Sequence, residues 1–226
     1  MSGYAAKFPD AAGRYSYSAE EDAVWGELYR RQMTNLRGKI APAYFEGVEL
    51  LGLTDKAVPQ VSEISARLQA LTGAGVVGVP AIIPPATFFS LLSERRFPVP
   101  TFLQRLHAMD YIEEPDIFHE VFGHCPLLTD PHYADFIERF GQRAVDLGKT
   151  YSWRMFRLFW FTIEFGMIRT SEGLRGYGAG IASSPAEAAH AVSGAAEALP
   201  FDLMTVLRTP YRIDILQPVY FVIDSF

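Results

Sequence analysis

The sequence predicts a mainly α-helical single domain with a few short β-strands. A capping box at Ser18 and Glu21 precedes an apolar stripe that includes Trp25. Apolar residues recur at helical spacing in residues 61–71, and prolines such as Pro42 open further helical segments. The 226 residues suit one domain with a sizeable core, and 49% hydrophobic with 20% charged residues is typical of a globular protein.

Each predicted element follows from local signals of this kind. The predicted helices span residues 18–37, 42–51, 61–73, 85–92, 115–123, 131–147, 153–169 and 185–193. The predicted strands span residues 76–79 and 219–223, with strand or extended chain at 211–216. Pro98 and Pro100 predict an extended loop. We expect residues 1–14 to be a mobile N-terminal segment and residues 15–226 to form the single domain.

Composition excludes several functional classes. A net charge of −6 argues against binding to nucleic acid or to an anionic membrane. Glycines and prolines interrupt the uncharged run 70–93, so it does not predict a membrane span. The single cysteine, Cys125, rules out an internal disulfide framework and suits a reducing cytoplasm. Its place beside His124 allows metal ligation, but a small buried residue is the preferred interpretation.

Two histidines and one glutamate form the most informative pattern. His119 and His124 lie five residues apart, and Glu164 follows in an aromatic segment. Two histidines and a carboxylate can hold a non-haem Fe(II) on one face and leave the other open for oxygen and substrate. The spacing differs from the His-Glu-x-x-His of zinc proteases. An ideal α-helix offsets such a pair by about 140°. We therefore expect Gly123 to end the helix in a left-handed conformation and to return His124 toward His119.

Simpler interpretations of the same residues exist. Two histidines five apart are often surface or core residues, and a glutamate among aromatics is often the polar edge of an amphipathic helix. Glu164, however, shares a predicted helix face with Trp160 and Ile163. An ionised carboxylate on such a face needs a partner, which a metal or an arginine would supply. This placement favours the metal interpretation.

Several longer segments carry a family resemblance. They are residues 24–32, 95–99, 114–128, 160–166, 177–184 and 219–222. Together they resemble the pterin-dependent aromatic amino acid hydroxylases, most closely the bacterial phenylalanine 4-hydroxylases, over residues 15–226. The resemblance implies the catalytic-domain fold of that family. It also implies an Fe(II) monooxygenase that uses O2 and a tetrahydropterin co-substrate, most simply to convert L-phenylalanine to L-tyrosine in phenylalanine catabolism. The family's regulatory domain and tetramerisation helix have no counterpart in the chain, so we expect a monomer. The lone cysteine and the lack of a visible targeting signal lead us to expect a cytoplasmic location.

The resemblance also assigns individual roles. Phe97 matches the aromatic residue that stacks on the pterin ring. Glu120 matches a glutamate that binds the pterin through water, and we expect it to point away from the ligand face of His119. Asp116 matches a residue that orients a ligand or the substrate site. Trp160 matches the aromatic residue that packs on the substrate ring.

The chain departs from the family at the residues that bind the substrate carboxylate. Ser183 matches a serine near that carboxylate. The family's carboxylate-binding arginine is replaced by Gln104, and Arg105 follows it. Either Arg105 takes over the role, or the substrate is another aromatic, such as tryptophan or one without a free amino acid group. Phe159 stands where the family usually has tyrosine, which removes a hydroxyl near the metal and alters the expected coupling.

Two other functions fit part of the pattern. A zinc hydrolase using the same three ligands would need neither oxygen nor Phe97. A non-catalytic binding protein would keep the fold without the chemistry. The absence of a His-Glu-x-x-His spacing and the surrounding aromatic residues argue against the hydrolase, and retention of all three candidate ligands and of Phe97 argues against the binding protein.

Overall fold

The computed structural model describes residues 6–104 and 115–226. The α-helices are α1 Ala19–Asn35, α2 Pro42–Leu50, α3 Val61–Thr72, α4 Pro85–Ser93, α5 Pro131–Leu147, α6 Ser152–Phe159, α7 Ala179–Ser183, α8 Pro185–Ala191 and α9 Leu203–Arg208. Other helical turns are η2 Phe118–His124, η3 Cys125–Thr129, η4 Lys149–Tyr151 and η5 Trp160–Glu164. The strands are β1 Gly75–Val79, β2 Arg96–Pro100, β3 Met167–Thr170, β4 Gly173–Gly176, β5 Glu197–Pro200 and β6 Val219–Ile223.

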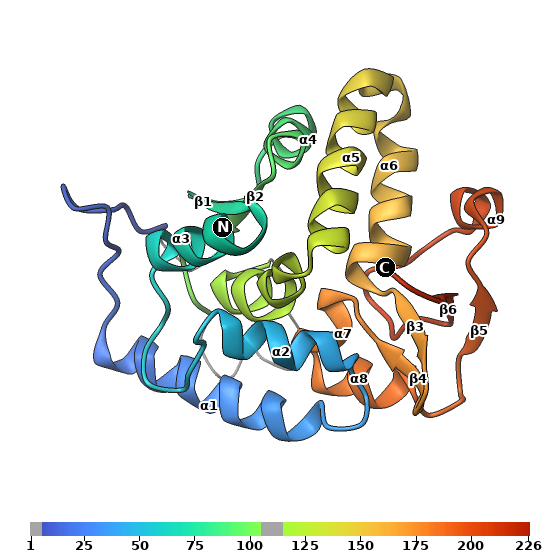
Figure 1. Cartoon of the computed structure of the whole chain (residues 1–226), viewed down its shortest axis with the longest axis horizontal. Coiled ribbons are helices and arrows are strands. Elements are labelled where there is room, and N and C mark those ends of the chain that lie inside the picture. Colours follow the sequence, from blue (N-terminus) through green and yellow to red (C-terminus); the bar gives the residue numbers. More distant parts are fainter. Residues whose placement is uncertain (1–5, 105–114) are drawn as a thin grey trace.

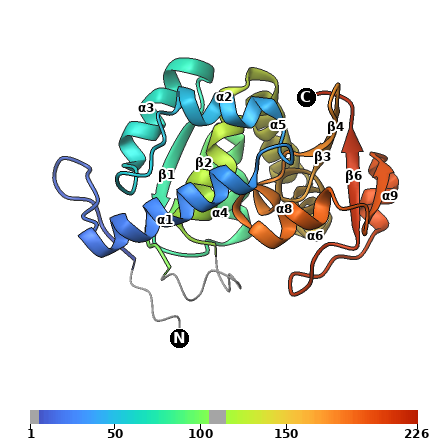
Figure 2. The same cartoon turned by 90° about the horizontal axis from the view of Figure 1, so that it is seen from below.

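The predicted helix-rich fold is confirmed. The segment η2–η3, yellow-green in Figure 1, lies at the centre, with α3 and α4 on one side and α5 and α6 on the other. In Figure 2, α1 crosses the face of the molecule that is turned toward the viewer. Long helices surrounding a short irregular one give η2 a buried environment. None of the helices in the described ranges combines the length and apolarity needed to cross a bilayer.

Local signals placed most helix ends correctly. Ser18 accepts a hydrogen bond from the backbone N–H of Glu21, whose side chain accepts one from Ser18, so the capping box is formed. Gly73 ends α3 in the left-handed conformation, with φ of 72°. Asp130 caps α5 through the N–H groups of His132 and Tyr133.

The predicted loop at Pro98 and Pro100 is instead strand β2. It pairs in parallel with β1 in a two-stranded sheet, with Val77 opposite Pro98 and Val79 opposite Pro100. Proline is tolerated there because β2 has a neighbour on one side only, so half of its N–H groups need no partner. The prediction failed because the pairing strand lies about twenty residues away and leaves no local trace.

The second sheet also departs from expectation. The helix predicted for residues 153–169 ends at Glu164, and Met167–Thr170 becomes strand β3. The four-stranded sheet has the order β4-β3-β6-β5. Residues 213–215 form a bend and residues 211–216 contain no strand, and β5 and α9 were not predicted. Pairing of β3 with β4 and β6 outweighs the helical periodicity of its sequence.

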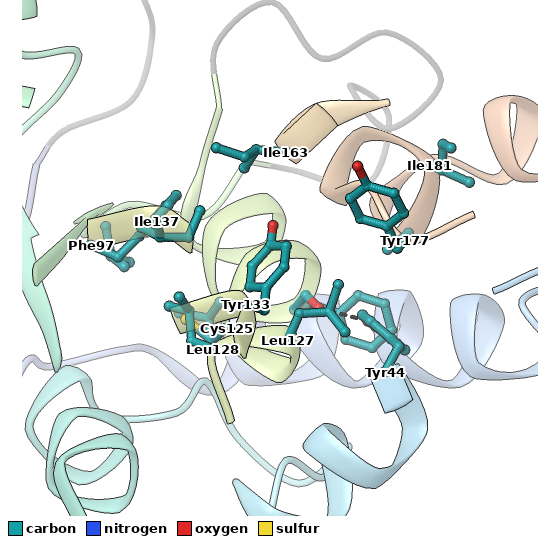
Figure 3. Packing of buried hydrophobic residues seen from close by; sticks show 14 of the residues in the cluster. Tyr44, Phe97, Cys125, Leu127, Leu128, Tyr133, Ile137, Ile163, Tyr177 and Ile181 are labelled. Atoms are coloured by element: carbon teal, nitrogen blue, oxygen red, sulfur yellow. Dashed lines mark hydrogen bonds between the residues drawn. The ribbon is translucent and has the colours of Figure 1, made fainter. Parts of the chain in front are cut away.

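The core is one main cluster that surrounds η2 and η3, with a smaller one around Phe161, Val206 and Phe221. Figure 3 shows Cys125 among the packed side chains, and this cysteine is fully buried as predicted. Tyr44 packs in the same region, and its hydroxyl donates a 2.6 Å hydrogen bond to the carbonyl of Phe122. This bond ties α2 to the helical turn that carries both histidines.

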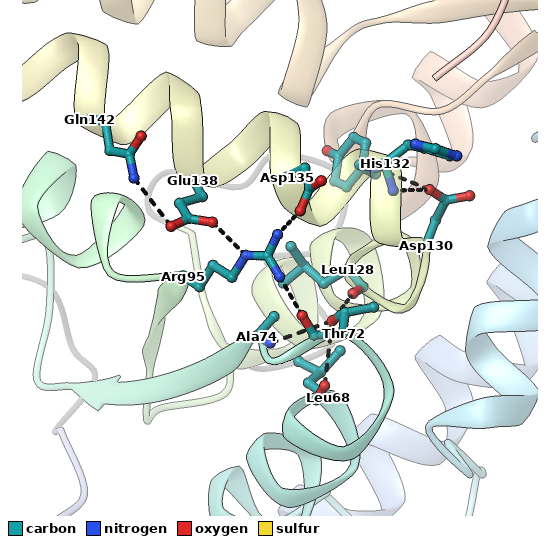
Figure 4. Close-up of polar contacts among 11 residues, drawn as sticks. Leu68, Thr72, Ala74, Arg95, Leu128, Asp130, His132, Asp135, Glu138 and Gln142 are labelled. Atoms are coloured by element: carbon teal, nitrogen blue, oxygen red, sulfur yellow. Dashed lines mark hydrogen bonds and ion pairs between the residues drawn. The ribbon is translucent and has the colours of Figure 1, made fainter.

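Arg95 fixes the start of β2. Its backbone has φ of 59°, a left-handed conformation that costs a non-glycine residue about 1–2 kcal/mol. The side chain offsets this cost by binding Glu138 and Asp135 of α5 and the carbonyl of Thr72 (Figure 4). Because Arg95 is two residues from Phe97, these contacts also hold Phe97 in place.

Candidate metal centre

Both histidines lie on a π-helix. In η2 the backbone follows i→i+5 hydrogen bonding, so residues five apart become neighbours along one face. The rings of His119 and His124 are 5.1 Å apart. The left-handed Gly123 that we expected is wrong, because this glycine lies inside the π-helix and its φ is not positive. Gly123 instead allows close packing, since a Cβ there would lie 3.0 Å from the Cβ of Ala179 in α7.

Glu164 reaches the histidines from the end of a second π-helix, η5. One carboxylate oxygen lies 3.4 Å from Nε2 of His119, and the other lies 3.2 Å from Nε2 of His124. Gly178 makes this position possible, because a Cβ on it would lie 2.1 Å from the carbonyl oxygen of Glu164. The turn that contains Gly178 therefore packs against the backbone of Glu164, the third candidate ligand.

The distances fit a metal ion between the three side chains. Two ligands that each lie about 2.1 Å from an ion, at right angles, are about 3.0 Å apart. The observed 3.2 and 3.4 Å are close to this value. His119, Glu120 and His124 also offer ligand atoms within 4.8 Å of one another, so Glu120 is a second carboxylate at the site. Glu164 is the better third ligand, since it approaches both imidazoles and Glu120 comes no nearer to His124 than 3.6 Å.

The position of Glu120 differs from expectation. It was expected to point away from the ligand face of His119, but its carboxylate lies at the same cluster. The prediction assumed an α-helix. In a π-helix each residue is rotated less relative to the one before it, so Glu120 faces closer to His119 than expected. Its proposed contact with the pterin stays a prediction.

The electrostatics of the site favour a bound cation. Burial lowers the pKa of His119, but Glu164 outweighs this effect and raises that pKa to about 9. Burial opposes the ionisation of Glu164, yet both histidines hold its pKa well below the usual range. Burial raises the pKa of Glu120, against the effect of the same two histidines. Buried carboxylates are stabilised by nearby positive charge, which a bound divalent metal or a protonated imidazole can supply.

Ser183 orients His119. Its hydroxyl donates a 2.9 Å hydrogen bond to the carbonyl of Ala179, and its oxygen lies 2.8 Å from Nδ1 of His119. Because the hydroxyl proton is already used, the serine oxygen must accept the bond from Nδ1–H. The Nε2 atom is thus directed toward Glu164, where a bound metal would replace its proton. The expected position of Ser183 near a substrate carboxylate stays a prediction.

His124 is held in a different way. Its Nδ1 atom is buried and has no hydrogen-bond partner among the described residues. Its ring lies 4.7 Å from that of Phe97 and 6.0 Å from that of Phe159. Packing against these aromatic rings therefore positions His124. Phe159 places apolar surface where tyrosine is usual in the resembled family.

Asp116 joins the loop before the site to the π-helix. One carboxylate oxygen accepts the N–H of Gln104 at 2.9 Å, and the other accepts the N–H of His119 at 3.0 Å. Burial raises the pKa of Asp116, although these hydrogen bonds favour its ionised form. Gln104 is thus brought close to the metal segment, whereas Arg105 lies outside the described residues.

Trp160 begins η5, four residues before Glu164. Its indole stacks on Tyr211 at 4.7 Å, and its N–H donates to the side chain of Gln217 at 2.8 Å. Sequence reasoning missed Gln217, because a contact across 57 residues leaves no local pattern. A cavity of about 440 Å³ lies elsewhere, between residues 14–22, 51–60 and α3, and none of the site residues lines it.

Comparisons with known proteins agree with this geometry. Residues 3–226 match the family described as biopterin-dependent aromatic amino acid hydroxylase. The chain is 46% identical over 222 residues to a phenylalanine-4-hydroxylase of Pseudomonas aeruginosa, covering 98% of this chain and 85% of that protein.

Solved structures agree as well. A cold-active phenylalanine hydroxylase of Colwellia psychrerythraea matches with a TM-score of 0.95 and 45% identity, over 98% of this chain and 85% of that one. A Chromobacterium violaceum phenylalanine hydroxylase with bound iron(III) and 7,8-dihydrobiopterin matches with a TM-score of 0.91 and 42% identity, over 97% and 80%. This protein therefore belongs to the biopterin-dependent aromatic amino acid hydroxylases.

Proposed function

We propose that this protein hydroxylates the ring of L-phenylalanine to give L-tyrosine, with Fe(II), a tetrahydropterin and O2. The observation that carries the proposal is the convergence of His119, His124 and Glu164 in a buried site. Relatives that are 41–46% identical and named phenylalanine-4-hydroxylase support phenylalanine as the substrate. Trp160, which we propose packs on the substrate ring, begins η5 four residues before Glu164.

The side chains divide the work between them. His119, His124 and Glu164 would hold the iron, which when bound activates oxygen with two electrons from the tetrahydropterin. Ser183 and Asp116 hold His119 by its ring and its backbone. These contacts fix the orientation of His119 before any substrate binds.

Apolar side chains exclude water from the same site. Phe97 is 2% exposed and Phe159 is 8% exposed, and both rings lie against His124. A dry pocket strengthens the interactions between the carboxylates and a bound cation. We propose that Phe97 and Glu120 contact the pterin, and that Trp160 contacts the aromatic substrate.

A single experiment tests the proposed function. The protein is loaded with Fe(II) without oxygen, and oxygen uptake is then followed with tetrahydropterin and a panel of phenylalanine, tyrosine, tryptophan and phenethylamine. We expect hydroxylated product from phenylalanine, dependent on both iron and pterin. Hydrolytic activity with zinc and without oxygen would instead identify a hydrolase. Tight binding of pterin and phenylalanine without turnover would identify a binding protein.

Replacing Phe97 by leucine should weaken use of the pterin selectively. The substitution keeps apolar volume beside His124 but removes the flat ring that a pterin can stack on. We expect the KM for tetrahydropterin to rise about 3- to 10-fold, a smaller loss than complete removal of a stacked aromatic. The KM for phenylalanine is measured in parallel. Equal increases in both KM values would show that Phe97 is structural only.

Replacing Arg105 by alanine should weaken recognition of the substrate carboxylate. If Arg105 serves in place of the arginine missing at position 104, kcat/KM for phenylalanine should fall about tenfold, the lower range for a charge-assisted hydrogen bond. The kcat/KM for phenethylamine, which lacks the carboxylate, should change little.

Gln104 supplies the matched variants for this prediction. Gln104→Ala should have little effect on phenylalanine. A gain in kcat/KM for phenylalanine from Gln104→Arg, with no loss from Arg105→Ala, would contradict the assignment and show a changed specificity. An unchanged kcat/KM for phenylalanine in both Gln104→Arg and Arg105→Ala would show that other residues bind the carboxylate.

Two wider expectations stay predictions. Light scattering of the purified protein tests the expected monomer, and fractionation of the producing cell tests the expected cytoplasmic location. The predicted mobility of residues 1–14 also stays untested. Within that segment, Lys7 pairs with Glu21 and its backbone exchanges hydrogen bonds with the side chain of Thr101.

A further inference from the structure

The indole of Trp160 is held on two sides. Its ring stacks on Tyr211 with an interplanar angle of 23°, and lies 4.6 Å from Phe165. Its N–H donates to Oε1 of Gln217 at 2.8 Å. Stacking alone leaves an aromatic ring free to slide and rotate in its plane. The hydrogen bond at the edge of the indole removes this freedom, because an N–H donor has one direction.

The orientation of the Gln217 amide is fixed by its surroundings. Its Nε2 donates to the carbonyls of Arg212 at 3.1 Å and of Ile215 at 3.2 Å. Both carbonyls only accept hydrogen bonds, so the NH2 end must face them and Oε1 must face Trp160. The side chain therefore satisfies two backbone groups and the indole at once, and a flipped amide would lose all three bonds.

The backbone of Gln217 is itself anchored by neighbouring elements. Only 2% of the residue is exposed. Its N–H donates to Oε1 of Glu187 at 3.2 Å, and its carbonyl lies 3.0 Å from Nε2 of His190. The hydroxyl of Tyr220, in β6, donates to the same Glu187 oxygen. These contacts fasten Gln217 to α8 and to the sheet, so it is a rigid support.

The segment next to Gln217 has little other support. Residues 212–216 are all exposed and form no regular secondary structure. Gln217 donates hydrogen bonds to two carbonyls of this segment, and Tyr211, which directly precedes the segment, stacks on one face of Trp160. One buried amide thus fixes both the edge of the indole and the segment that covers its face.

We propose that Gln217 is a positioning residue that sets specificity for the aromatic substrate by holding the plane of the Trp160 indole. The inference rests on the proposed function, in which Trp160 packs on the substrate ring. A tilted or mobile indole presents a poorer surface to that ring, which weakens substrate binding and lets oxygen be consumed without hydroxylation. Gln217 touches neither substrate nor cofactor in this role and acts only through Trp160.

The test replaces Gln217 by methionine, which keeps the length and volume of the side chain but removes the amide. We expect the KM for phenylalanine to rise about 3- to 10-fold, the range for the loss of one hydrogen bond. Tyrosine formed per pterin oxidised should fall. The KM for tetrahydropterin and the iron content should stay within about twofold of wild type.

Gln60→Met is the matched control for loss of a buried amide. Gln60 is 9% exposed, bonds both backbone groups of Tyr15, and precedes α3 on the opposite side of the molecule (Figure 1). We expect a similar fall in Tm for both variants, but no change in the KM for phenylalanine in Gln60→Met. The same KM change in both variants would reduce Gln217 to a structural residue.

A double-mutant cycle separates action through Trp160 from any other route. Trp160→Phe keeps an aromatic ring but cannot donate to Gln217. In that background, Gln217→Met should change the KM for phenylalanine less than twofold. A full effect in that background would overturn the proposal.

A spectroscopic readout keeps this inference separate from the proposed function. The difference in near-ultraviolet circular dichroism between wild type and Trp160→Phe gives the Trp160 signal. Gln217→Met should alter that signal, and Gln60→Met should not. An unchanged signal in Gln217→Met overturns the inference even if wild type hydroxylates phenylalanine. A wild type that hydroxylates no aromatic overturns the proposed function, and with it the specificity role.

Discussion

Glu164→Gln, His119→Gln and His124→Gln are each expected to abolish hydroxylation and to lower iron affinity at least about 100-fold. Changes to groups that only orient metal ligands already cost 10- to 100-fold, so loss of a ligand should cost more. A glutamine keeps most of the side-chain volume in a core where His124 is 2% exposed, so the protein should remain folded. Anaerobic titration with Fe(II), followed by measurement of tyrosine formation, gives both quantities.

Glu120→Gln is the control for this set. Glu120 lies 3.6 Å from His124, but in our assignment it is not a ligand. We expect the variant to retain iron and to lose activity only through weaker use of the pterin. If Glu120→Gln loses iron and Glu164→Gln keeps it, Glu120 is the third ligand. Near-normal turnover of any histidine variant at saturating iron would remove that histidine from the site.

Ser183→Ala is expected to lower iron affinity about 10- to 100-fold, with the three ligands unchanged. The serine oxygen accepts a hydrogen bond from Nδ1 of His119 and so keeps Nε2 directed at the metal. Without it, the buried Nδ1–H has lost its partner and the imidazole can rotate or adopt the other tautomer. Fe(II) titration against a competing chelator measures the loss, and excess iron should restore much of the activity.

Ser184→Ala provides the neighbouring control. The hydroxyl of Ser184 accepts the N–H of Glu187 and caps α8, so its loss should cost about 1 kcal/mol of stability. It does not contact His119, and iron affinity should stay at the wild-type value. Equal losses of iron affinity in the two variants would show that Ser183 acts through the fold of α7 and α8, and not through the histidine.

Much of the site followed from the residues alone. Two histidines and a glutamate in apolar segments indicated an iron centre, and the structure brings the three side chains together. The start of α1 at Ser18 and the end of α3 at Gly73 also followed from local capping signals. Such features are predictable because a cap or a ligand set depends on residue type and on short spacing.

The shape of the site did not follow from the residues. No sequence periodicity marks the π-helix η2, which makes His119 and His124 neighbours. This helix packs closely against α7 at Gly123. Strand β3 replaces the end of a predicted helix because β4 and β6 pair with it.

The sequence by itself determined the chemical class of the site and most of the helices, since local residue types and short spacings specify both. Only the tertiary structure decided how the ligands are oriented and which groups support them. Ser183 lies 64 residues from His119, and Gln217 lies 57 from Trp160. Contacts of that kind depend on which surfaces meet when the whole chain buries its core, so no local pattern encodes them.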